Sequence, residues 1–183
     1  MGDSTTSGAF REITCGICDR KNIAAVLAVS REAPLVEWVR CVGCGSGSVL
    51  NDGLQSPSTK PGESLEGLPE EVKAAHSEAR ACVGIGAYTS AEMMCRKILM
   101  HVAVDKGAGA GQTFAAYLSY LSDEGYTTPP MRAWVDVIRK HGNTAVHEIP
   151  PTDQERALGT LVFTEQLLRT VYVMEYLAQK FTP

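Results

Sequence analysis

Cys15-Gly16-Ile17-Cys18 and Cys41-Val42-Gly43-Cys44 are the two stretches that decide the fold of the first quarter of this 183-residue chain. A spacer of two residues lets two thiolates face one tetrahedral ion, and a second such pair completes a four-thiolate shell. The two pairs are separated by 22 residues, which is typical of a structural zinc ribbon. We therefore predict one structural Zn²⁺ per chain, held by these four cysteines. A shell of four protein ligands leaves no open position, so this zinc is expected to build structure and to do no chemistry.

The composition is that of a globular protein, because hydrophobic residues make up 44% of the chain. No apolar run approaches the roughly 18 residues that a membrane span needs, and no secretory segment follows the start. We therefore expect a cytoplasmic protein with no membrane partner. Six cysteines in a reducing compartment favour a metal over the alternatives, which are disulfides and free thiols.

The charge is mildly acidic, with a net value of −4. Residues 1–52 carry five Lys or Arg against six Asp or Glu, so the ribbon is not basic. A protein that grips many phosphates needs a basic stripe. The sequence therefore argues against tight non-specific binding of nucleic acid by the monomer, and leaves room for a local patch.

Four regions follow from the pattern of turn-forming and apolar residues. We expect a disordered tail over 1–9, a zinc ribbon over 10–50, a linker over 51–66 and a helical domain over 67–183. Within the ribbon, the β-branched and apolar runs 24–29 and 35–39 predict strands. The linker holds Pro, Ser and Gly with almost nothing apolar.

The rest of the chain has helical periodicity, and the fold class is mainly α. Two capping boxes, Thr89-Ser90-Ala91-Glu92 and Thr152-Asp153-Gln154-Glu155, predict helix starts, and Gly107 predicts a helix end. Thr128-Pro129 predicts another start. Five helices are expected, over about 69–85, 89–106, 113–122, 128–141 and 152–180.

Polar residues gather unusually in the stretch 139–148, where Arg139, Asn143 and His147 surround Gly142. An asparagine and a glycine at a helix end need only backbone reasons, so a structural role is one interpretation and a functional site is the other. Elsewhere, Cys82 and Cys95 lie on apolar helical faces and are expected to be core thiols. His76 and His101 are isolated, and a surface or core position is favoured over metal ligation for both.

The arrangement resembles a widespread bacterial and phage domain family of unknown function. The resemblance rests on the four-cysteine ribbon, the polar linker, Gly86-Ala87-Tyr88 and Gly142-Asn143-Thr144-Ala145-Val146-His147 before a long last helix. That family is grouped with the HEPN (higher eukaryotes and prokaryotes nucleotide-binding) superfamily, which implies a five-helix HEPN-like bundle.

Active HEPN proteins are similar to metal-independent ribonucleases with an arginine and a histidine four to six residues apart, usually across a dimer interface. By this resemblance, His147 matches the histidine and Asn143 the polar residue after the arginine. The arginine position itself is occupied by Gly142, and Arg139 lies one helical turn earlier.

Three interpretations of the function remain open. The first is a non-catalytic binding or dimerisation module in bacterial or phage conflict (defence) systems, with a homodimer formed through the helical domain and a possible protein or RNA partner. The alternative is an RNA-cleaving enzyme in which His147 moves a proton and Arg139, or an arginine of a partner chain, holds the phosphate. A third possibility is that the ribbon recognises the partner and the bundle only presents it.

Overall fold

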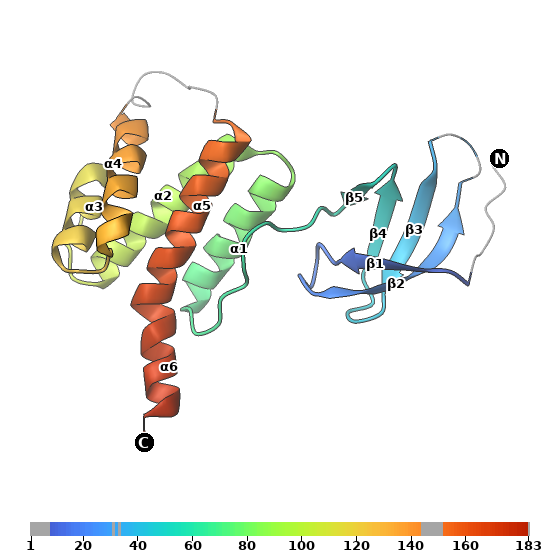
Figure 1. Ribbon diagram of the computed structural model, residues 1–183, viewed down its shortest axis with the longest axis horizontal. Helices are drawn as coiled ribbons and strands as arrows, with labels where there is room; N and C mark the ends of the chain where they lie inside the picture. Colours follow the sequence, from blue (N-terminus) through green and yellow to red (C-terminus); the bar gives the residue numbers. More distant parts are fainter. Residues whose placement is uncertain (1–7, 31, 33, 144–151, 183) are drawn as a thin grey trace. The chain divides into compact units, whose positions relative to one another are not determined.

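The computed structural model describes residues 8–30, 32, 34–143 and 152–182, and for 140–143 the backbone alone. These residues form two compact units, which divide between Lys60 and Pro61 (Figure 1). The first unit is all β, and the second is helical.

The first unit is one antiparallel sheet in which the spatial order of the strands follows the chain. The strands are β1 Phe10–Thr14, β2 Lys21–Val29, β3 Val36–Cys41, β4 Gly47–Asn51 and β5 Leu54–Ser56. The two predicted strands correspond to β2 and β3, whereas β1, β4 and β5 were not predicted. These three strands lack a long β-branched run, and β5 is only three residues long.

Alternation along the strands separates the sheet into two faces. In β3, for example, Glu37, Val39 and Cys41 are buried, whereas Trp38 and Arg40 are exposed. The buried face holds a small core made of Ile13, Cys15, Ala24, Val26, Val39 and Cys41. An ion pair between Arg11 and Glu37 crosses the same face.

The described part of the second unit contains five helical stretches, as expected. They are α1 Glu70–Gly84, α2 Tyr88–Asp105, α3 Phe114–Asp123, α4 Pro129–Asn143 and a continuous stretch that runs from Gln154 to Phe181. Their apolar faces meet in a core that includes Leu99, Leu118, Phe163 and Leu167. Gly107 adopts a φ of +109° just past α2, which confirms the predicted helix end.

Two of the predicted helix starts are displaced. α2 begins at Tyr88, so Thr89 lies inside the helix, and the N-cap Ala87 makes no side-chain bond. The tight turn after α1 explains this, because the Ala87 amide donates to the Cys82 carbonyl and already sets the helical direction. In the last helix Asp153 replaces Thr152 as the cap and accepts from the Arg156 amide at 2.8 Å.

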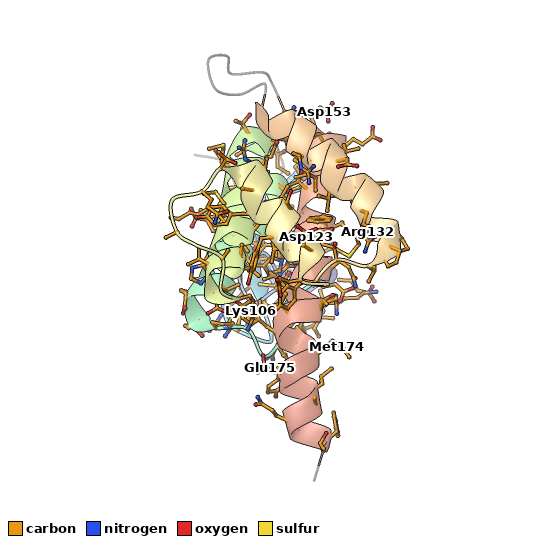
Figure 2. All side chains as sticks on the ribbon, turned by 90° about the vertical axis from the view of Figure 1, so that its left-hand side faces the viewer. Lys106, Asp123, Arg132, Asp153, Met174 and Glu175 are labelled. Atoms are coloured by element: carbon orange, nitrogen blue, oxygen red, sulfur yellow. The ribbon has the colours of Figure 1, made fainter. Side chains whose placement is uncertain are left out.

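The last helical stretch contains an irregularity that periodicity did not reveal. It comprises α5 Gln154–Leu168, a π-helical segment Arg169–Val173 and α6 Met174–Phe181. α6 has no buried residue, even though its predicted apolar face continued that of α5. α6 extends past the other helices of the unit, as the positions of Met174 and Glu175 in Figure 2 show.

The stretch 51–66, expected as a linker, is largely built into the two units. Its first residues form β5 and pair with β4, and the Gln55 side chain donates to the carbonyls of Thr14 and Pro57. At its other end, Leu65 is buried in the helical core.

Searched over the described residues, no helix has the length and apolarity required to cross a bilayer.

Candidate metal centre

The two Cys-x-x-Cys segments fold into the same backbone turn. In each, the amide of the first cysteine donates to the carbonyl five residues later, and the amide four residues later donates back to the cysteine carbonyl. These bonds are Cys15 to Arg20 at 3.0 Å, Asp19 to Cys15 at 2.8 Å, Cys41 to Ser46 at 2.9 Å and Gly45 to Cys41 at 2.9 Å. The residues at the matching position, Asp19 and Gly45, both have positive φ, at 60° and 76°. We call these two turns the first and second knuckle.

The knuckles bring the four sulfurs together. All four Sγ atoms lie within 4.8 Å of one another, and those of Cys15 and Cys44 are 3.7 Å apart. A tetrahedral ion with metal–sulfur bonds of about 2.3 Å requires sulfurs about 3.8 Å apart. A disulfide needs about 2.05 Å, and the structure has the cysteines as free thiols. The four predicted ligands are therefore close enough together to hold one metal ion in a four-thiolate site.

The surroundings of the Cys44 sulfur favour the thiolate, which is the form that binds a metal. The Ser46 hydroxyl, and then its backbone amide, lower the pKa of Cys44 to about 6. In the first knuckle, the backbone amide of Arg20 bonds the Cys18 sulfur and by itself lowers the pKa, but burial and the hydrogen bonds with the other three cysteines outweigh it and raise the pKa of Cys18 to about 11. Each knuckle thus directs an amide, two residues after its second cysteine, at a ligand sulfur.

Two glycines inside the knuckles meet different neighbours. A Cβ on Gly16 would lie 2.4 Å from the carbonyl oxygen of Ser58 and 2.5 Å from that of Pro57. A Cβ on Gly43 would lie 2.1 Å from the amide nitrogen of the Asn22 side chain. Backbone therefore covers the first knuckle, whereas a side chain that can rotate covers the second.

A second polar cluster lies inside the helical unit and was not predicted. His76 on α1 is buried, and its Nε2 is 3.0 Å from Oε1 of Glu165, which is also buried. The same oxygen accepts from the Glu63 amide at 3.0 Å. Arg80, one turn after His76, donates to the carbonyls of Pro61 at 2.8 Å and Gly62 at 3.0 Å. We call this set the strap cluster, because it fastens 61–63 to α1 and α5.

The sequence does contain a signal for this cluster. His76 and Arg80 are four residues apart and share the buried face of α1 with Val72, Ala79 and Val83. Polar residues on an apolar face require buried partners. The partner Glu165 is 89 residues away from His76, so the pairing itself is a product of the fold.

Other buried groups in the bundle have structural partners. Glu92 on α2 accepts from the Thr152 hydroxyl at 2.9 Å and from Arg156 at 2.6 Å. Cys95 is fully buried, and burial raises the pKa of its thiol to about 12, which confirms a core thiol. Cys82 is partly buried in the same region.

The residues predicted for RNA chemistry are only partly described. The Arg139 Nη2 donates to the Ser119 hydroxyl at 3.1 Å, and its Nη1 is 3.5 Å from Asp136, one turn earlier on α4. Asn143 ends α4, but its side chain lies outside the described part of the chain, as does the whole of His147. The structure therefore places Arg139 between α3 and α4 and does not test its convergence with the other two residues.

Comparison with known proteins assigns the helical unit to a family. Residues 77–182 match the family described as a domain of unknown function (DUF4145), which covers more than half of the chain. The chain belongs to this family. Searches of the curated proteins and of the solved structures found no match.

Proposed function

We propose that the chain is a zinc-stabilised, non-catalytic binding module whose helical unit forms a homodimer. The observation that supports the metal part most strongly is the closed set of four sulfurs on two equivalent knuckles. When bound, Zn²⁺ would be held by Cys15, Cys18, Cys41 and Cys44 and would supply cross-linking of the ribbon. With all four positions taken by protein, no position is left for a substrate or water.

The metal is tested by elemental analysis of the purified chain. We expect one zinc per chain, and a cobalt-substituted sample with the absorption of a tetrahedral thiolate site. Four thiolates can also hold iron, so a red sample containing one iron per chain would overturn the zinc assignment while preserving the site. A metal content near zero in a folded chain would overturn both.

The engagement of Arg139 supports the non-catalytic interpretation. A phosphate clamp needs guanidinium donors that face the substrate, and two nitrogens of this group already contact Ser119 and Asp136. The place of the superfamily arginine is taken by Gly142. The bundle would then serve to bind partners and to pair, in a bacterial or phage defence setting that rests on the HEPN resemblance alone.

The exposed last helix supports the dimer. α6 has no buried residue, and Met174 and Phe181 leave most of their apolar surface in solvent. A helix with such a stripe commonly packs against a second helix. Loss of dimerisation in Met174→Lys, measured by sedimentation, would support this assignment, and an unchanged dimer would contradict it.

The decisive assay for the function is cleavage of mixed RNA by the zinc-loaded dimer. We expect no cleavage above background by the wild type. Cleavage that disappears in His147→Ala and falls in Arg139→Ala would establish the ribonuclease alternative instead. Cleavage that persists in both variants would indicate a contaminant, and the same preparation is then tested after a further purification step.

A further inference from the structure

The ribbon sheet has two apolar faces, and its core uses one of them. An antiparallel sheet with one face in solvent normally presents polar side chains there. On the face opposite the cysteines, four large side chains are exposed instead: Phe10 at 59%, Ile23 at 45%, Trp38 at 43% and Leu54 at 75%. We call this surface the outer face. A sheet with apolar side chains on both faces normally packs against another layer on each side, so the outer face is expected to be covered by a second layer.

The register of the strands shows how the outer face is shaped. Ala28 on β2 lies directly opposite Trp38 on β3, and Ala25, also on β2, lies opposite Phe10 on β1. Two outer positions of β2, Ala25 and Ala28, are therefore small, although Ile23 near the start of β2 is large, and the flanking strands carry aromatic rings. A trough floored by two alanines runs beside a ridge that includes Trp38.

Adjacent trough and ridge make this face complementary to itself. A twofold axis that runs along the strands, between β2 and β3, places β3 of one copy over β2 of the other. Each Trp38 ridge then enters the alanine trough of the opposite copy. Sheets packed face to face interdigitate in this way, with a spacing of about 10 Å.

The area and the charge of the face are consistent with a second copy as the occupant. Four half-exposed large side chains leave on the order of 400 Å² of apolar surface, so two copies bury about 800–1,000 Å², which is the size of a weak, transient association. Arg40 shares the face, but its Nε donates to the Gly45 carbonyl at 3.1 Å, which draws the charge toward the second knuckle. The register places Lys21 and Glu12 on the same exposed face, where their charges offset one another, so this surface lacks the concentrated positive charge that a nucleic acid needs.

We infer that the outer face of the ribbon is a self-association surface that packs against the same face of a second copy. The inference does not depend on which metal fills the knuckles or on what the helical unit binds. It adds an interface to the one proposed for α6.

The test uses the full, metal-loaded chain and measures its self-association constant by sedimentation. Trp38→Lys is expected to weaken self-association at least tenfold. Leu35→Lys is the matched control, because Leu35 is 57% exposed but lines the cavity on the opposite face with Ile13 and Leu50. It is expected to leave the constant within twofold. Metal content and thermal melting establish that both variants are folded.

Met174→Lys separates this inference from the dimer proposed for the helical unit. If Met174→Lys weakens association and Trp38→Lys does not, the outer face is overturned as an interface while the helical dimer stands. If Trp38→Lys weakens it and Leu35→Lys does not, the outer face is established.

A second readout is the fluorescence of Trp38 in a Trp134→Phe background, which leaves one tryptophan in the chain. A concentration-dependent blue shift is expected as the ridge becomes covered. An emission maximum that stays that of an exposed indole at every concentration at which the chain self-associates would overturn the inference.

Discussion

The ribbon and the helical unit are stabilised in different ways. The described core of the ribbon contains six buried residues, of which two are the metal-facing cysteines Cys15 and Cys41. Among the described residues, the main core of the helical unit contains eighteen that are buried, and none of them is a knuckle cysteine. A core as small as that of the ribbon does not stabilise a fold without a cross-link. We therefore expect that loss of the metal ion unfolds the ribbon and leaves the helical unit folded.

Metal removal is the change expected to have the largest effect. Structural zinc supplies on the order of 10 kcal/mol of folding free energy in small zinc domains. We expect a strong chelator, or Cys41→Ser, to abolish the protection of ribbon amides against hydrogen exchange while the helical circular dichroism signal persists. Cys82→Ser is the control, because this thiol lies in the helical unit and should not alter the metal content. Parallel loss of the helical signal would show that the two units do not fold independently.

Breaking the strap cluster should produce the reverse result. Glu165→Ala removes the acceptor for the Glu63 amide and the partner of His76, all in a buried setting. Leaving such groups unpaired is expected to lower the free energy of unfolding of the helical unit by about 2–4 kcal/mol. Urea unfolding followed by helical circular dichroism measures it, with the metal still bound.

The control for this variant is Glu155→Ala, which changes an exposed carboxylate on the same helix. It should change the unfolding free energy by less than about 0.5 kcal/mol. Equal effects of the two substitutions would mean that the strap cluster contributes nothing specific. Release of the metal by Glu165→Ala would contradict the independence of the two units.

The two cores also differ in how far the sequence predicted them. The four knuckle cysteines were predicted residue by residue, because a spacer of two residues places both thiols of a pair on one local turn. The helices were predicted from periodicity to within a few residues. The strap cluster and the π-helical segment 169–173 were not, because both depend on contacts between residues distant in the sequence. Thr89 and Thr152 have the right residue type for a cap, but the N-caps are Ala87, two residues before Thr89, and Asp153, one residue after Thr152.

Within the ribbon, the glycines of the two knuckles allow a finer comparison. Gly16→Ala pushes a methyl group against the Ser58 and Pro57 carbonyls, which are backbone and must shift. We expect a loss of about 1–3 kcal/mol in the free energy of unfolding of the metal-loaded ribbon. Gly43→Ala meets the Asn22 side chain, which can rotate away, and should cost less. Chelator-induced unfolding rates of the two variants give the order, and the reverse order would contradict the packing of 57–58 over the first knuckle.

The smallest expected effect tests whether the knuckles are equivalent. Asp19 and Gly45 occupy the same turn position with φ of 60° and 76°, so the first knuckle already tolerates a side chain there. Asn and Asp adopt this conformation more readily than other residues, whereas a β-branched residue is strained by about 1–2 kcal/mol. A side chain at 45 would first meet the Arg40 guanidinium, at 3.3 Å from the Cβ, and that group is flexible. Gly45→Asn should therefore keep the metal affinity within about threefold and cost less than 1 kcal/mol, while Gly45→Val should cost more. Competition with a zinc indicator measures the metal affinity of the two variants. Equal losses of affinity in Gly45→Asn and Gly45→Val would show that the second knuckle requires glycine for a reason other than its φ.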